Sequence, residues 1–167
     1  MVQSGFLERL RSNDQSAWAE FYDSVAGDLR SYLARQGARN PDDALGEVMV
    51  QVVRSIKSFA GTDEELRPWT FGIARHRVLD EGRRRSKRPV ETVLVDDEIA
   101  APLAVDPDPT QLAEYLDLLT DDQREVVWLR FGLDFSLEET AVVVGKDPQA
   151  VAALSYRALQ RLRRLLG

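Results

Sequence analysis

Apolar residues recur at helical spacing along most of the chain. A short helix is expected around 6–10, and a longer one from about Ser16 to Gly37, where glycine favours termination. Asn40 and Pro41 then predict a new helix start, because asparagine caps a helix and proline suits its first turn. These periods predict an α-helical N-terminal region.

The next segments continue the helical pattern. The helix that starts at Pro41 is expected to reach about Ser58, and a loop at 61–63 follows it. A long helix then runs to about Arg85. Its predicted buried stripe consists of Phe71, Ala74, Val78 and Leu79.

Helix-start signals recur near the C-terminus. Thr120 with Gln123 and Ser136 with Glu139 have the spacing of capping boxes, in which two side chains satisfy the first backbone N–H groups. A helix over 136–145, a tight turn and a second helix over 148–165 have the length and punctuation of a helix-turn-helix. The chain shows no strand pattern.

Four prolines and no amphipathic period separate these two helical regions. The sequence therefore predicts an all-α fold with two small helical domains joined by an acidic flexible linker, the second being a helix-turn-helix. The expected boundaries are 1–88 for the first domain, 89–109 for the linker and 110–167 for the second domain.

Composition narrows the classes of function. The chain is 44% apolar and 30% charged, and its share of apolar residues is enough for packed cores. The absence of cysteine excludes disulfides, thiolate zinc sites and cysteine nucleophiles. No apolar run is long enough to span a membrane, and the N-terminus lacks a secretory signal, so a cytoplasmic protein is expected.

Charge is distributed unevenly, although the net charge is −6. Residues 66–88 hold eight of the 22 basic residues, whereas 89–123 contain ten acidic residues and no basic one. After Asp147 the chain has four arginines and no acidic residue. Such basic segments indicate nucleic acid as a partner, even in an acidic protein.

The sequence contains no motif that indicates catalysis. The single histidine, His76, has no cysteine partner, and neither a glycine-rich phosphate loop nor a metal-ligand cluster is present in the sequence. We therefore expect no enzyme activity, no catalytic or metal-binding residues and no cofactor.

The C-terminal helix pair fits DNA binding. In a helix-turn-helix the second helix lies in the major groove, with its first residues at the base edges. A structural hairpin would show the same pattern, but the basic C-terminal tail favours DNA, because neutralised phosphates supply much of the affinity.

Three motifs, in order, resemble a known family. The segment PDDALGEVMVQVVRSI resembles the family's helix that docks on the clamp helices of the RNA polymerase β′ subunit. The segment RPWTFGIARHRVLDEGRRR resembles the family's melting and minus-ten segment. The start of its fourth domain resembles LLTDDQREVVWLRFGLDFSLEETAVVVG. Together they make the chain similar to a bacterial extracytoplasmic-function, or group IV, sigma factor.

The resemblance implies a function and a set of partners. Such a protein binds core RNA polymerase at the β′ clamp helices and the β flap, selects promoter DNA and melts it, and is held by an anti-sigma factor. The acidic linker is expected to thread into polymerase channels built for nucleic acid and to mimic RNA there.

The resemblance also implies site residues in the first domain. The polymerase-binding set is Asp43, Glu47, Met49 and Arg54. The set for minus-ten DNA is Trp69, Arg75, His76, Arg77, Arg83 and Arg84, in which arginines follow the phosphates and an aromatic surface replaces lost base stacking. The loop 60–66 would help to form a pocket for a flipped base.

The recognition helix departs from the family. Gln149, Ser155, Arg157 and Arg161 are the candidates for minus-thirty-five DNA. However, 152–154 read Ala-Ala-Leu where polar residues are common, and these side chains form no hydrogen bonds to bases. Weak readout, reliance on DNA shape, and a protein partner facing Leu154 all stay open.

Two other readings remain. The chain would be a DNA-binding regulator that never joins polymerase if the 41–58 helix were dispensable. It would be a sigma-like interaction protein if the apolar recognition helix did not read promoters.

Overall fold

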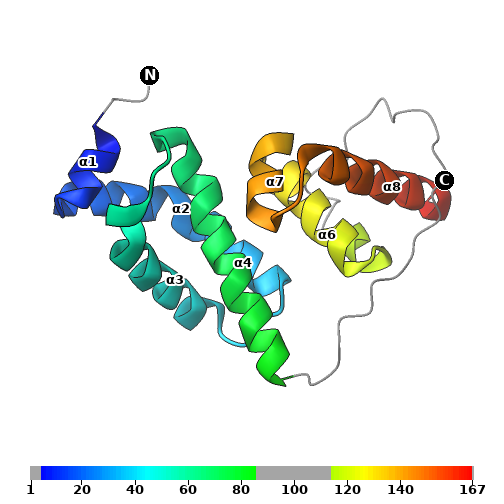
Figure 1. The fold of residues 1–167 in the computed structure, drawn as a ribbon. Helices are drawn as coiled ribbons and strands as arrows, with labels where there is room; N and C mark the ends of the chain where they lie inside the picture. Colours follow the sequence, from blue (N-terminus) through cyan, green and yellow to red (C-terminus); the bar gives the residue numbers. More distant parts are fainter. Residues whose placement is uncertain (1–4, 86–113, 167) are drawn as a thin grey trace. The chain divides into compact units, whose positions relative to one another are not determined.

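The computed structural model describes residues 5–85 and 114–166, and every regular element in these ranges is helical (Figure 1). The contacts divide the chain into two units, Met1–Lys87 and Arg88–Gly167. The predicted all-α fold with two helical domains is therefore confirmed. The predicted linker, 89–109, lies outside the described residues, so the exact domain boundaries stay predictions.

In its described residues, 5–85, the first unit is a bundle of four α-helices and two short 3₁₀ turns. Its elements are α1 (Phe6–Arg11), α2 (Gln15–Arg35), α3 (Pro41–Ser55), η1 (Ile56–Ser58), η2 (Asp63–Glu65) and α4 (Leu66–Arg85). Helices α2, α3 and α4 pack against one another in pairs, as Figure 1 shows in blue, cyan and green. Tyr32 of α2 and Phe71 of α4 meet in the core with ring centroids 5.5 Å apart.

The buried stripe of α4 agrees with the prediction at three of four positions. Phe71, Ala74 and Val78 are buried, whereas Leu79 is only half-buried. Successive helical residues are rotated by about 100°, so Leu79 lies at the edge of the stripe that Val78 shares with Phe71.

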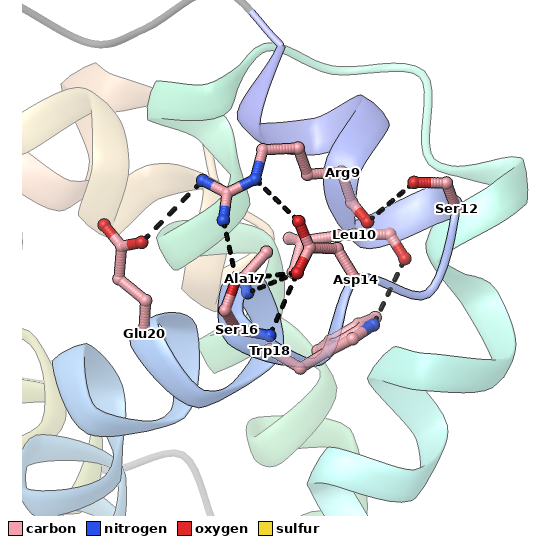
Figure 2. Close-up of polar contacts among 8 residues, drawn as sticks. All are labelled: Arg9, Leu10, Ser12, Asp14, Ser16, Ala17, Trp18 and Glu20. Atoms are coloured by element: carbon pink, nitrogen blue, oxygen red, sulfur yellow. Dashed lines mark hydrogen bonds and ion pairs between the residues drawn. The ribbon is translucent and has the colours of Figure 1, made fainter.

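An ionic cap joins α1 to α2 (Figure 2). The Asp14 carboxylate accepts hydrogen bonds from the Ser16 and Ala17 backbone N–H groups at 3.0 and 3.3 Å, and so caps α2. The Arg9 guanidinium donates to the same carboxylate at 3.0 Å. Hydrogen bonds from the Ser16 side chain and from Arg9 lower the pKa of Asp14 to about 2.

Apolar contacts and a hydrogen bond from a tryptophan hold α1 against the start of α2. Leu7 and Leu10 are buried, and the Trp18 indole N–H donates to the Leu10 carbonyl at 3.2 Å (Figure 2). Although α1 has only six residues, it is therefore fixed to the start of α2.

The second unit is built on a separate core. Its elements are η3 (Leu116–Leu118), α6 (Asp121–Val127), η4 (Trp128–Gly132), α7 (Leu137–Val144) and α8 (Pro148–Leu166). Helix α8 packs against both α6 and α7. The central apolar cluster consists of Leu116, Leu119, Val127, Ala158 and Leu162.

Local capping signals set the helix ends of this unit as predicted. Both capping boxes form, with the Thr120 and Ser136 hydroxyls accepting from the backbone three residues on. Gly145 ends α7 in the left-handed region at φ +69°, and Asp147 accepts from the Ala150 N–H at 2.9 Å to start α8. The predicted helix-turn-helix is confirmed.

One element of this unit was not expected. The segment η4 is a π-helical turn, in which the Leu133 N–H reaches the Trp128 carbonyl five residues back at 2.9 Å. Gly132 is needed there, because a Cβ atom on it would lie 2.7 Å from Trp128 Cδ2.

Candidate nucleic-acid interface

The outer face of α3 carries the predicted polymerase-binding residues. Asp43, Glu47 and Arg54 are exposed, and Met49 is half-buried. They point outward because the opposite face of α3 supplies the core with Ala44, Leu45, Val48 and Val52.

Two valines that are not among the predicted polymerase-binding residues extend this outer face. Val50 and Val53 are 50% and 48% exposed, beside the charged side chains. An apolar strip with a charged border is typical of a protein-binding surface. Their place off the buried period of α3 was the available signal.

An ion pair connects the two sets of residues predicted for polymerase and for DNA. Arg77 Nε of α4 donates to Glu47 Oε2 of α3 at 2.6 Å. The pair lies in a groove of about 410 Å³ between these helices. Its lining includes Arg39, Asp43, Glu47, Arg77, Asp80, Glu81 and Arg84.

The remaining residues of α4 that are predicted to bind minus-ten DNA differ in exposure. His76 and Arg84 are exposed, Arg75 is half-buried, and Arg83 is exposed but lies 3.8 Å from the Asp80 carboxylate. The face is therefore mixed in charge, and Arg84 lines the groove described above.

Trp69 is part of an aromatic pair at the start of α4. Its ring stacks on Phe59, with centroids 4.5 Å apart and planes inclined by 30°. Both side chains are half-buried, so part of the paired surface is open. The sequence reasoning singled out Trp69 but missed Phe59, because no sequence period links a loop residue to a helix ten positions later.

The predicted residues of the second unit do not form one surface. Gln149 is exposed in the first turn of α8, and Arg157 is half-buried. Arg161 is half-buried and donates from Nε to the Leu118 carbonyl at 2.7 Å, which ties α8 to η3. Ser155 is buried and donates to the Val151 carbonyl at 2.9 Å, which removes it from the surface available to DNA.

Apolar side chains occupy the outer part of α8 between these polar residues. Ala153 is exposed, and Ala152 and Leu154 are half-buried. On the preceding helix Val142 is 59% exposed. The helix pair therefore presents methyl groups where a base-reading helix usually presents hydrogen-bonding groups.

Two further properties concern the whole described part of the chain. Within 5–85 and 114–166, no three acidic or histidine side chains lie where they could hold a metal ion. No helix in the same ranges is long and apolar enough to cross a membrane.

Family models match both units. The model described as sigma-70 region 2 matches residues 17–88, and the model described as sigma-70 region 4 matches residues 110–162. The first covers most of α2 and all of α3 and α4, and the second covers α7 and most of α8.

Curated relatives of the chain are also named sigma factors. The extracytoplasmic-function sigma factor SigD of Mycobacterium tuberculosis is 33% identical over 129 residues, covering 73% of this chain and 61% of SigD. The sigma factor SigV of Bacillus subtilis is 30% identical over 137 residues, covering 78% of this chain and 80% of SigV. The chain thus spans less than two thirds of the length of SigD.

A solved structure shares the fold. The sigma factor RpoE of Bartonella quintana, crystallised with the anti-sigma factor NepR, superposes with a TM-score of 0.65 at 22% identity. The superposition covers 89% of this chain and 95% of RpoE.

Proposed function

The chain belongs to the RNA polymerase sigma factors of the extracytoplasmic-function type, and from this premise we propose that it binds core RNA polymerase, recognises a promoter and opens its duplex. The observation that carries the proposal is the match of region 2 and region 4, in that order, to the two helical units. The role is to bind and position, without catalysis by this chain, and it is exercised in the cytoplasm.

Docking on polymerase would use the outer face of α3. Asp43 and Glu47 lie one turn apart and are exposed, so two negative charges can meet a basic partner surface. Val50 and Val53 beside them supply apolar area that water leaves on binding. The clamp helices of the β′ subunit are the proposed partner of this face.

Capture of one DNA strand would use the start and the polar face of α4. A base released from a duplex loses its stacking, and an aromatic surface such as the Phe59–Trp69 pair can replace it. Arg84 and His76, exposed on the same helix, would follow the phosphates and base edges of that strand. Arg75 and Arg83 would add positive charge from α4.

The second unit would meet the upstream promoter element and the β flap. Gln149 is the exposed hydrogen-bonding group at the first turn of α8, and Arg157 remains a candidate for a phosphate. The methyl groups at 152–154 suit contact with thymine methyls and recognition of DNA shape better than hydrogen-bonded readout.

An anti-sigma factor is the third proposed partner. Support comes from the related fold of RpoE, which was crystallised with the anti-sigma factor NepR. A protein that covered the exposed apolar strip of α3 would compete with polymerase for the same surface.

Charge reversal on α3 tests the proposal. Wild-type chain should co-purify with core RNA polymerase, and Asp43→Arg with Glu47→Arg should abolish binding. The matched control is Glu20→Arg with Asp23→Arg, which reverses two exposed acids on α2 outside the proposed docking face. This control should bind like the wild type.

The alternatives predict other results. A regulator that never joins polymerase would bind duplex DNA alone, and both charge-reversed variants would behave alike. An interaction protein would bind polymerase or another protein but would fail to open promoter DNA in a permanganate footprint.

A further inference from the structure

We propose that Arg11 of α1 is a positioning residue that sets the loop carrying Phe59 for capture of an unpaired base; this inference rests on the proposed function. The reason is that α1 binds the 56–63 segment at three points. None of these contacts involves the predicted DNA-binding side chains themselves.

The first two contacts come from one side chain. Arg11 Nη2 donates to the Phe59 carbonyl at 2.5 Å, and Nε donates to the Ile56 carbonyl at 3.4 Å. The third nitrogen, Nη1, pairs with Glu8 on the same helix. The guanidinium therefore uses its whole planar fork, which the single ammonium of lysine does not reproduce.

The third contact closes the far end of the segment. The Leu7 backbone N–H donates to Asp63 Oδ1 at 3.2 Å. This N–H belongs to the first turn of α1, where no intrahelical acceptor is available for it. Arg11 and Leu7, one turn apart, thus hold the loop before and after its central residues.

The loop in turn fixes the aromatic pair. The carbonyl that Arg11 binds belongs to Phe59, whose ring stacks on Trp69 at 4.5 Å. The ring also lies against Gly61, where an added Cβ would come within 2.9 Å of Phe59 Cε2. The backbone of Phe59 is therefore held by α1, while its ring packs on Trp69 and lies close to the glycine.

The burial of Arg11 separates a positioning role from direct DNA contact. Its side chain is 26% exposed, against 44% for Arg77, and its donors are occupied by two carbonyls and Glu8. An arginine that binds phosphate needs open donors. Loss of Arg11 should therefore weaken base stacking and leave phosphate binding unchanged.

The test uses the full chain bound to core RNA polymerase and two short fluorescent DNA strands. One strand consists of thymidines, and the other is identical except for abasic nucleotides at its centre, so that phosphates are equal and bases differ. Wild type should bind the thymidine strand more tightly. Arg11→Ala should lose about tenfold on that strand, within the range for one base–aromatic stack, and nothing on the abasic strand.

Companion variants exclude a simple folding defect. Arg11→Lys keeps the charge but should not restore the tenfold loss, and Asp63→Ala should show the same selective loss through the other end of the loop. Arg30→Ala, which removes a surface cation of α2 paired with Asp42, should bind both strands like the wild type. Thermal unfolding of each variant is followed in parallel.

Two results would overturn the inference. Arg11 would be a phosphate ligand if Arg11→Ala lost the same affinity on both strands and if the slope of log affinity against log salt concentration fell by the value for about one phosphate contact. If Arg11→Ala and Asp63→Ala both bound the strands like the wild type, the contacts of α1 with the 56–63 segment would be purely structural. If wild type itself did not distinguish the strands, the proposed capture by the aromatic pair would fail instead, which separates the two hypotheses.

Discussion

The sequence predicts that α3 binds polymerase, that α4 binds minus-ten DNA and that α8 binds minus-thirty-five DNA, but the helices of the first unit differ from α8 in what they expose. On α3 and α4 the predicted residues Asp43, Glu47, His76 and Arg84 are exposed. Of the four residues predicted for DNA on α8, only Gln149 is exposed. Arg161 is tied to η3 and Ser155 is buried.

This difference suggests a division of labour within the proposed function. A surface with open charges and an aromatic pair can bind both polymerase and a melted strand. A helix with methyl groups outward contributes shape and a few contacts. Affinity for promoter DNA would therefore depend mainly on the first unit, with the second unit adjusting position.

The largest expected effect concerns the stability of the second unit alone. Gly132→Ala would press a methyl group against the Trp128 ring, and such overpacking costs about 1–3 kcal/mol of the free energy of unfolding. Urea unfolding followed by tryptophan fluorescence measures the loss. Promoter binding that survived it would support the dominant role of the first unit.

The control for this variant is a glycine with free space. A Cβ atom at Gly72 in α4 would meet no atom within 4 Å, so Gly72→Ala should be neutral or stabilise by about 1 kcal/mol or less. Equal destabilisation by both variants would contradict the steric account of Gly132.

Removal of the aromatic surface should have the next largest effect. Trp69→Ala should weaken binding of single-stranded DNA by the holoenzyme about tenfold, as expected for loss of a base–aromatic stack. Trp69→Phe keeps a ring against Phe59 and should retain most of the affinity. Fluorescence anisotropy gives both values, and a similar loss for Trp69→Phe would argue against stacking.

A substitution that adds a DNA-binding cation to α8 tests the comparison from the second unit. Ala153→Arg adds an exposed cation to the apolar part of the helix, and one new phosphate contact should steepen the salt dependence of DNA binding by about 0.9. Titration at several salt concentrations measures the slope. An unchanged slope, together with loss of a protein partner, would mean that this face binds protein.

How far the sequence predicted these surfaces depends on the range of each signal. Helix starts at Asn40, Thr120 and Ser136 follow from side chains that cap their own helices, and all three form. The burial of Ser155 was also readable, because it lies on the same helical stripe as Val151 and Leu162.

Contacts between distant segments were not predictable in this way. The Arg77–Glu47 pair joins residues 30 positions apart on two helices, and the Phe59–Trp69 stack joins a loop to a helix. Each depends on how α3 packs on α4, which a single sequence does not state. The site was therefore predicted as a set of residues, but its connections came from the fold.

The Arg77–Glu47 pair offers a smaller test of the first unit. Glu47→Gln would release Arg77 for phosphate, so the free chain should bind DNA more tightly by at most about fivefold, since exposed ion pairs contribute about 1 kcal/mol or less. Its binding to polymerase should fall at the same time. A weaker affinity for both partners would mean that the pair orients Arg77 and does not compete with DNA.

The smallest expected effect is on the stability of the first unit at acidic pH, and it acts through the cap of α2. The pKa of Asp14 is lowered from 3.8 to about 2, so the folded chain favours the ionised carboxylate. This contribution to stability is fully present above pH 3.8 and is lost as the pH falls through about 2. Asp14→Asn keeps a capping oxygen but removes the charge that faces Arg9. The wild type should therefore melt at a higher temperature than Asp14→Asn near neutral pH, and the difference should shrink as the acid transition is crossed; a difference that stayed constant with pH would assign the stabilisation to the cap geometry alone.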